Sequence, residues 1–590
     1  MTEGALAAAR ATGEVLAFTL VTLAVCWGLG QLLLRIWRAE RRRDLAPDTT
    51  AWIGWGAAVA VIQIWHLALR PGWVLALLLC CAGAVGLLLA REEARALASS
   101  AWRSHAGVVV TVALAAVWLA NTSLAAPRNG DSGLYHFQAV RWAAAFPDVP
   151  GLANLLGRLG FTSSYTLYLA LPEALAGIGR ACHLANAALF LLPIARGAWA
   201  LARLADRRRP WRAGTVFDAL AVLPLVERVW SEQVLTSATP DLPVFVLGIV
   251  ATSLLLRTFE EPHEGAAGAR AAAVVWLAAV GVTVKLSFAG FAAAAAALAV
   301  VAQRRAARRE RAGAEASVAL VPLALSCAAV LVPWLARSMV LSGYPLYPFP
   351  GISVPVDWRL PRAAALEDYN WVRSWARHPG ADWHAVLGSS TWFPGWLRRV
   401  TGSTHTLLTF CLPLGLAAGA AIASPLVARK RPGALRLAVA AAPAVVSLVL
   451  WFLAAPEPRL AGSAAWCLGL GLAAIAVASA FPDGPMRAFR TLALLAGGIV
   501  LATFVVELRQ RGLLPVAAGP DAGFHPARAV ETATVPTAWG LEVHVPIGTA
   551  ECWNAPLPCT PWLDPALRLR RDGDLASGFT VASAQGGNPR

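Results

Sequence analysis

Charged residues are scarce in this chain of 590 residues, because Asp, Glu, Lys and Arg together account for only 14% of it. Hydrophobic residues account for 57%, a composition that argues against a soluble multidomain enzyme. Apolar runs of about 20 residues recur along the chain, and each is long enough to cross a hydrocarbon core roughly 30 Å thick. The sequence therefore predicts an all-α, polytopic membrane protein that is embedded in the lipid bilayer.

Lysine is nearly absent. The chain has 50 basic residues, of which only Lys285 and Lys430 are lysines, and its net charge is +16. Nucleic-acid-binding proteins also carry such a charge, but here the basic residues form short clusters between apolar runs, as cytoplasmic loops do. We therefore expect no nucleic-acid partner. The clusters lie at residues 35–44, 206–212, 304–311 and 429–432.

The chain also lacks a basic segment before its first apolar run, near residues 15–34, because Arg10 is the only basic residue among the first 14. We expect that run to be an uncleaved anchor with the N-terminus on the extracytoplasmic side. Alternation from there predicts about 13 to 14 transmembrane helices within residues 1–507, including spans near 215–233 and 491–507. This count places every strong arginine cluster on the cytoplasmic side.

Two long segments between the spans, residues 127–180 and 337–403, are expected to be extracytoplasmic loops. Within the first, a proline and a glutamate interrupt residues 161–180 too early for a full crossing, which favours a short helix on the membrane surface. The stretch at 271–302 has Lys285 near its middle, which favours two spans that meet at a tight outer turn.

Of nine cysteines, seven lie in or beside apolar runs, and only Cys552 and Cys559 lie in a polar segment, CWNAPLPCTPW. Residues 508–590 are expected to form a small extracytoplasmic module, in which these two cysteines can form a disulfide. The alternative is a pair of free thiols in a cytoplasmic tail. Roughly the last twenty residues of the module are expected to be disordered.

One polar stretch, NGDSGLYHFQAVRW at residues 129–142, directly follows the predicted fourth span. Asp131 is therefore a carboxylate at the membrane boundary, near the level of a lipid-linked phosphate. It could act as a general base toward a hydroxyl or bind a divalent cation, and the residues from 134 onward predict a surface helix. Alternatively, Asp131 is a loop or cap residue and the aromatic residues only anchor the chain at the interface.

Three further outer segments carry charged residues. Asp241 in TSATPDLP lies at an outer edge, where it lines a site or caps the following helix. Lys285 lies within an apolar stretch, where an ammonium costs about 2.5 to 3.5 kcal/mol at mid-helix, so it should bind a phosphate or reach toward the interface. Glu457 and Arg459 lie in the turn APEPRLAG, where Arg459 can bind a phosphate bidentately or pair with Glu457.

A first large outer loop with an acid just after a helix, followed by a surface helix and further outer loops, resembles the GT-C superfamily of membrane glycosyltransferases. These enzymes take sugars from polyprenyl-phosphate donors. The stretches DSGLYHFQAVRW, GLANLLGRLGFTSSY, TPDLP, VKLS, GYPLYPF, PEPRL and CWNAPLPCTPW are similar to an uncharacterised bacterial family that resembles this superfamily, over residues 120–565. With the topology, the resemblance implies a multi-pass protein of a bacterial inner membrane.

The resemblance implies that Asp131 is the catalytic base and that Lys285 and Arg459 hold the phosphate of the sugar donor. Many members have a second acid two residues further on, where this chain has Gly133, so a metal-free mechanism is favoured over one with a divalent cation. No metal ligand or cofactor is assigned, and the acceptor is an envelope glycan, lipid or protein. The substrate pocket is expected to contain Tyr135, His136, Gln138, Arg141, Asp241 and Glu457.

Two other functions fit the sequence. A ligase or polymerase of polyprenyl-linked glycans also uses a large outer loop rich in arginine and histidine, as residues 337–403 are. A transporter or flippase is the other alternative, and Glu227 and Glu232 are its ionisable candidates. Against transport, the chain has few ionisable residues at span centres and no paired, broken repeat helices.

Overall fold

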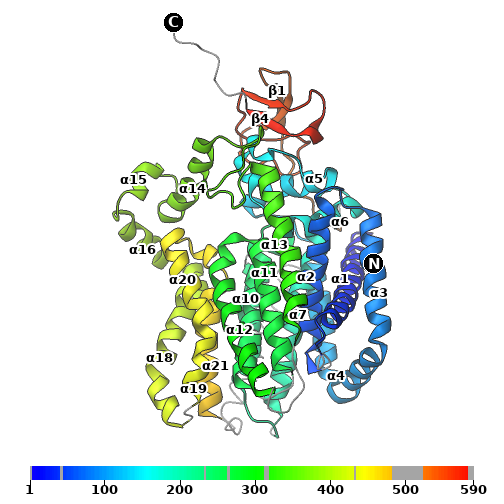
Figure 1. Ribbon diagram of the computed structural model, residues 1–590, viewed down its shortest axis with the longest axis vertical. Coiled ribbons are helices and arrows are strands. Elements are labelled where there is room, and N and C mark those ends of the chain that lie inside the picture. The colour runs from blue at the N-terminus through cyan, green and yellow to red at the C-terminus, as the bar shows by residue number, and fades with distance from the viewer. Residues whose placement is uncertain are drawn as a thin grey trace.

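The computed structural model describes residues 3–39, 44–206, 208–231, 234–261, 266–310, 318–430, 433–481 and 523–581. These residues are mostly helical. Long helices form a bundle, and one end of it carries short helices and two small β-sheets (Figure 1). We call this end the upper end, and it comprises residues 123–163, 343–406 and 523–581.

The bundle contains α1 (Glu3–Ile36), α2 (Pro47–His66), α3 (Trp73–Leu89), α4 (Arg91–Thr122), α6 (Ser164–Ala176), α7 (Ala181–Ala205), α8 (Ala213–Leu220), α9 (Val222–Ser231), α10 (Asp241–Glu260), α11 (Ala267–Val284), α12 (Ala289–Glu310), α13 (Leu320–Ser342), α18 (Leu412–Lys430), α19 (Ala434–Leu437), α20 (Ala442–Ala454) and α21 (Ala464–Ala480). The upper end contains α5 (Phe137–Ala145), α14 (Arg362–Arg377), α15 (Trp383–Leu387), α16 (Trp392–Gly402), α17 (Thr404–Thr406), β1 (Thr532–Pro536), β2 (Glu542–Pro546), β3 (Leu567–Leu569) and β4 (Phe579–Val581). Single 3-10 or π turns connect them: η2 (Ser132–His136), η3 (Leu152–Asn154), η4 (Gly157–Gly160), η5 (Val234–Thr236), η6 (Leu286–Phe288), η7 (Leu407–Cys411), η8 (Ala438–Ala441), η9 (Pro458–Ala461) and η10 (Leu575–Ser577).

Eight helices in the described part of the chain are long and apolar enough to cross a membrane, or nine if α3 and the start of α4, bent by 73°, form one span. This is fewer than the 13 to 14 predicted. One reason is that residues 215–233 are divided between α8 and α9. Another is that the apolar helices at 438–454 and 464–480 are shorter than a full span. The span predicted at 491–507 lies outside the described residues.

The two stretches of uncertain span count behave differently. At 271–302 the predicted division into two helices is confirmed, because α11 ends at Val284, α12 begins at Ala289, and Lys285 lies in the break. At 161–180 the short helix exists as α6, but its placement on the surface is wrong. Both Tyr165 and Leu167 are fully buried, because α6 packs among α2, α5 and α7.

The centre and the outside of the bundle are both apolar. Nearly all side chains of α10 and α11 are buried, whereas α13 and α18 point apolar residues outward, among them Val321 and Ile422, which are 70% and 81% exposed. Helices that are apolar on their outer faces suit lipid better than water. Glycine allows close packing inside, since a side chain at Gly54 of α2 would collide with the backbone of α1.

The lower end of the bundle gathers basic segments from different parts of the sequence. Arg196 in the C-terminal half of α7 pairs with Asp48 at the start of α2, at 2.5 Å. Arg212 pairs with Glu261, and the amide of Ala319 donates to the carbonyl of Trp37 (2.9 Å). The described parts of the clusters at 35–44 and 206–212 therefore share one end, opposite the upper end, as the sequence predicts.

The described part of the C-terminal module, residues 523–581, contains two antiparallel hairpins, β1–β2 and β3–β4. Phe579 of β4 is fully buried against Trp142 of α5, with ring centroids 5.6 Å apart, and its amide donates to the carbonyl of Pro150 (2.9 Å). The predicted disorder is therefore wrong for residues up to 581, because β4 completes a packed core. Residues 582–590 lie outside the described part.

Candidate functional site

The turn that carries Asp131 is held by its neighbours. The amide and hydroxyl of Ser132 donate to the side-chain oxygen of Asn129, at 2.9 and 3.1 Å. The Ser132 hydroxyl also lies 3.0 Å from that of Ser237 and accepts from the amide of Ala238 (3.2 Å). Ser132 thereby joins the turn after α4 to the loop before α10. Sequence reasoning missed this residue because a serine beside an aspartate gives no signal of its partner.

Two ion pairs lie beside this turn. Oδ2 of Asp131 lies 2.7 Å from Nη1 of Arg459, which stands in η9 between α20 and α21. Asp241, the first residue of α10, pairs with Nζ of Lys285 in the break between α11 and α12. The four side chains are 20% to 44% exposed, so a ligand can reach them.

The two pairs form one cluster. Asp241 acts electrostatically on Asp131, and Arg459 acts on both Asp131 and Asp241. Four segments of the chain meet here, and the residues farthest apart in sequence, Asp131 and Arg459, are 328 positions apart. We call Asp131, His136, Asp241, Lys285 and Arg459 the charge cluster. Sequence reasoning selected all five as site residues, and the structure brings them together.

The electrostatics of Asp131 suit an ionised carboxylate. Burial raises the pKa of Asp131. The positive charge of Arg459, the electrostatic effect of the nearby His136 and the hydrogen bond from Arg459 together lower it by more, so the pKa lies below its ordinary value. In turn, burial opposes the charge of Arg459, but Asp131 and Asp241 outweigh that effect and raise the pKa of Arg459. Both groups are therefore charged at neutral pH, and Asp131 is a weak base while this pair persists.

His136 is the neutral member of the cluster. Only 6% of it is exposed. Burial lowers its pKa to about 4, although Asp131 and Asp241 act in the opposite direction. Its Nδ1 has no partner among the described residues. The Tyr135 ring lies 4.1 Å from the His136 ring, and burial, reinforced by Asp131, raises the pKa of Tyr135.

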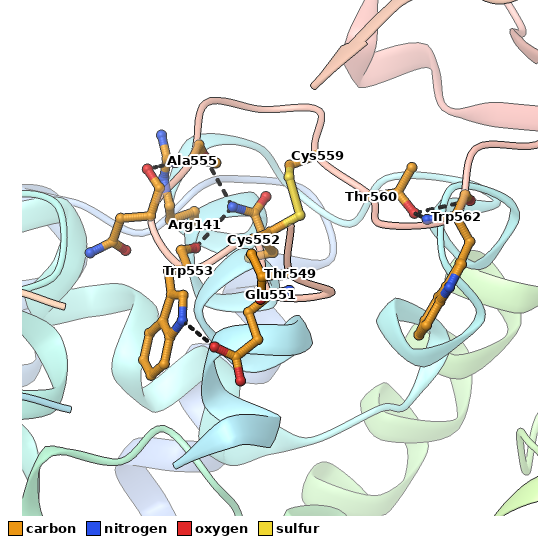
Figure 2. Close-up of a disulfide and its surroundings, with 11 residues drawn as sticks. Arg141, Thr549, Glu551, Cys552, Trp553, Ala555, Cys559, Thr560 and Trp562 are labelled. Carbon is orange, nitrogen blue, oxygen red and sulfur yellow. Dashed lines mark hydrogen bonds between the residues drawn. A yellow bond between two sulfur atoms is a disulfide. The ribbon is translucent and has the colours of Figure 1, made fainter. Parts of the chain in front are cut away.

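Gly133, where many GT-C members have a second acid, faces the disulfide loop. A side chain at Gly133 would collide with the indole of Trp553, whose amide donates to the Gly133 carbonyl (2.8 Å). The Trp553 ring also packs against Phe137 at 5.5 Å, and its Nε1 donates to Glu551 (2.7 Å) (Figure 2). The position therefore has no room for a carboxylate.

Gln138 and Arg141 lie away from the charge cluster. The side-chain Nε2 of Gln138 donates to the backbone carbonyls of Trp553 and Ala555, at 3.0 and 2.9 Å. Arg141 donates to the carbonyls of Asn554 (2.7 Å) and Ala555. These bonds hold the loop closed by the disulfide Cys552–Cys559, which is present as predicted (Figure 2). The helix α5 is thus covered by the C-terminal module, and its predicted exposure on the membrane surface is wrong.

Glu457 pairs with Arg399 of α16 at 3.3 Å and not with Arg459. Burial raises the pKa of Glu457, and the two arginines oppose this. Arg399 also donates to the carbonyl of Ala376 (2.9 Å). Glu457 therefore connects the turn before α21 to the loop at 337–403. Arg459 forms its ion pair with Asp131 instead.

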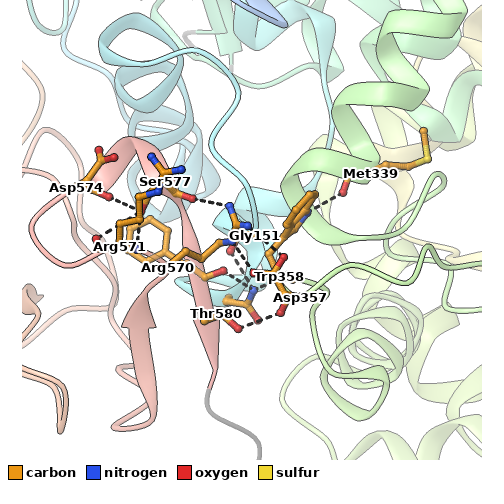
Figure 3. Close-up of polar contacts among 11 residues, drawn as sticks. Gly151, Met339, Asp357, Trp358, Arg570, Arg571, Asp574, Ser577 and Thr580 are labelled. Carbon is orange, nitrogen blue, oxygen red and sulfur yellow. Dashed lines mark hydrogen bonds and ion pairs between the residues drawn. The ribbon is translucent and has the colours of Figure 1, made fainter.

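The loop at 337–403 also contacts the C-terminal module. Both oxygens of Asp357 accept from Arg570, at 2.7 and 3.1 Å, and the hydroxyl of Thr580 donates to the Asp357 carbonyl (3.1 Å) (Figure 3). The indole of Trp358 donates to the carbonyl of Met339 in α13 (3.3 Å). Loop and module therefore form one cap over the end of the bundle that holds the charge cluster.

Of the two glutamates considered for transport, Glu227 and Glu232, the structure describes only Glu227. Glu227 in α9 lies 3.5 Å from Nε2 of His405 in α17, so it is paired at the surface of the bundle and not isolated within a span. Glu232 lies outside the described residues. Within the described ranges, no group of three or more His, Cys, Asp or Glu side chains could hold a metal ion.

A family model described as a domain of unknown function, DUF8201, matches residues 14–465, which include the charge cluster. Neither the curated proteins nor the solved structures contain a match to the chain.

Proposed function

We propose that this chain, which belongs to the DUF8201 family, is a multi-pass glycosyltransferase of the GT-C type in a bacterial inner membrane. It would transfer a sugar from a polyprenyl-phosphate donor to an envelope glycan, lipid or protein on the extracytoplasmic side, where the N-terminus and the C-terminal module lie. The observation that carries the proposal is the meeting of Asp131 with Arg459, Lys285 and Asp241 at one end of an apolar bundle.

The chemistry requires a base and a stabilised leaving group. The acceptor hydroxyl oxygen forms a bond to the anomeric carbon of the sugar, and the bond from that carbon to the phosphate oxygen breaks with inversion. The hydroxyl proton goes to Asp131, and the electron pair leaves with the phosphate. Arg459 and Lys285 match the charge that develops on this phosphate, which is the main requirement when the leaving group is already a good one.

Because Asp131 is paired with Arg459, we expect the donor phosphate to bind before Asp131 acts as the base. A donor phosphate that accepts hydrogen bonds from Arg459 competes with Asp131 for the guanidinium. Since Arg459 lowers the pKa of Asp131, its engagement by phosphate raises that pKa and makes Asp131 a stronger base. The base is therefore activated when the donor is bound.

The donor side is tested first by mass spectrometry of lipids that co-purify with the protein. We expect polyprenyl-phosphate or its glycosylated form on the wild type, and its loss from a Lys285→Ala, Arg459→Ala double variant. The matched control is Arg570→Ala, which removes an arginine paired with the exposed Asp357 and should retain the lipid. Bulk phospholipid alone on all three proteins would refute the donor assignment.

The catalytic side is tested with Asp131→Asn. This variant should lose transfer from polyprenyl-phosphate sugars while its folding is unchanged, because the amide cannot take the proton. Asp382→Asn is the control, since Asp382 is 67% exposed and its side chain pairs with its neighbour His384. Normal turnover by Asp131→Asn would exclude the mechanism. Transfer of preassembled oligosaccharides only would indicate a ligase.

A further inference from the structure

A second positive centre, Arg158, lies beside Tyr135, whose ring in turn contacts that of His136 in the charge cluster. The guanidinium of Arg158 lies 4.3 Å from the ring centroid of Trp371 in α14 and 5.9 Å from that of Tyr135. The charges of Asp131 and of Arg158 also act on the pKa of Tyr135, in opposite directions. Tyr135 therefore lies near both the charge cluster and Arg158.

The turn that carries Arg158, η4, is tightly held. A side chain at Gly157 would collide with the carboxylate of Asp368, and one at Gly160 would lie 3.1 Å from the ring of Tyr347. Phe161, directly after the turn, contacts the rings of Tyr135 and Tyr347, at 6.0 and 5.6 Å between centroids. The position of Arg158 is therefore set by packing.

No acceptor among the described residues uses the donors of Arg158. Among the described residues its guanidinium makes no hydrogen bond and no ion pair, and its side chain contacts the two aromatic rings. Asp368, an acid on which Arg158 acts electrostatically, accepts a hydrogen bond from the hydroxyl of Tyr347, and burial raises the pKa of Asp368 despite Arg158. The charge of Arg158 is therefore poorly neutralised.

Stacking on Trp371 covers a face of the guanidinium and leaves the N–H groups at its edge available. This geometry is the one in which arginine binds a carboxylate or phosphate bidentately. We propose that Arg158, stacked on Trp371, is a subsite for an oxyanion carried by the acceptor. The inference rests on the proposed function, since it assigns the donor phosphate to Arg459 and Lys285 and the anionic group of the acceptor to Arg158.

The test uses the full chain in nanodiscs of phosphatidylcholine, with three probes: D-glucuronate, glucose 6-phosphate and neutral glucose. Binding is measured by isothermal titration and by saturation-transfer NMR. The two anionic probes should bind at least about 10-fold more tightly than glucose, the value of one charged hydrogen-bonding contact. Arg158→Ala should remove that difference, and Arg158→Lys should retain part of it.

Arg373→Ala is the matched control, because Arg373 also stacks on an aromatic ring of α14, that of Tyr369, at 5.1 Å. It should bind the probes as the wild type does. If Arg158→Ala and Arg158→Lys both bind them like the wild type, the subsite is refuted. If phosphatidylglycerol in the nanodisc displaces the probes from the wild type, the anion is a lipid headgroup, and the assignment to the acceptor is overturned.

The subsite and the catalytic proposal can fail separately. Asp131→Asn should retain the preference for anionic probes, because Arg158 contacts the rings of Tyr135 and Trp371 and not Asp131. Loss of probe binding in Arg158→Ala, in a protein that transfers no sugar in any assay, would support the subsite and refute the transferase. Loss of transfer in Asp131→Asn, with normal probe binding by Arg158→Ala, would do the reverse.

Discussion

Asp148 provides the sharpest test of how the upper end is attached to the bundle. Its Oδ1 lies 2.8 Å from Nδ1 of His66, at the end of α2, and 2.8 Å from Nε of Arg337 in α13. The three side chains are 1% to 7% exposed. The other ring nitrogen of His66 lies 2.9 Å from the carbonyl of Ala143 in α5. This network therefore connects two bundle helices to the segment that follows the charge cluster.

We predict that Asp148→Asn destabilises the folded protein by about 3 to 5 kcal/mol, since removing one partner of a buried ion pair leaves an uncompensated charge. The amide keeps the size of the side chain and an accepting oxygen, so loss of charge is the main change. Asp357→Asn is the control, because Asp357 is 61% exposed and its pair with Arg570 should contribute at most about 1 kcal/mol.

The assay is denaturant unfolding of both variants in the same detergent, followed by circular dichroism. A double variant, Asp148→Asn with Arg337→Gln, should be less destabilised than the sum of the single variants, because it removes the stranded charge together with its partner. If Asp148→Asn lowers the free energy of unfolding no more than Asp357→Asn does, the network does not stabilise the fold and the reasoning is refuted.

Three further predictions concern the charge cluster and the turn that carries Asp131. Arg459→Gln should raise the pKa of Asp131 and so move the acidic limb of the pH–rate profile to higher pH; an unmoved limb would show that Asp131 is not the base. His136 has a pKa of about 4 against an ordinary 6.5, so the unfolded state binds more protons between these values. Stability should therefore fall by about 3 kcal/mol as the pH decreases from 6.5 to 4, and His136→Phe should reduce that fall. Gly133→Ala should cost about 1 to 3 kcal/mol in thermal unfolding through its collision with Trp553, whereas Gly107→Ala, with open space around it, should cost nothing.

The partners of the charged residues show the limit of local reasoning. The sequence marks Arg459 as a cation in a turn between apolar runs, and its nearest acid in the chain is Glu457. In the structure Glu457 pairs with Arg399 and Arg459 pairs with Asp131. Neither pairing has a sequence signal, because each depends on which helix ends lie next to each other.

The helix after Asp131 illustrates a second limit. Its pattern of polar and apolar residues fits a surface helix, and Gln138 and Arg141 are plausible ligand contacts on such a helix. A segment more than 400 positions later, residues 553–555, accepts their hydrogen bonds instead. Arg158 shows the converse, because nothing near it in the sequence indicates that it stacks on Trp371 of α14.

The sequence alone determined the helical class, the break at Lys285, the disulfide and the short list of ionisable residues near the ends of apolar runs. These follow from local physics: the length of an apolar run, the cost of a charge within it, and two cysteines outside it. Only the tertiary structure decided which charges neutralise each other and which remain available. The reason is that an ion pair depends on distances between helices, and packing sets these distances between residues far apart in the chain.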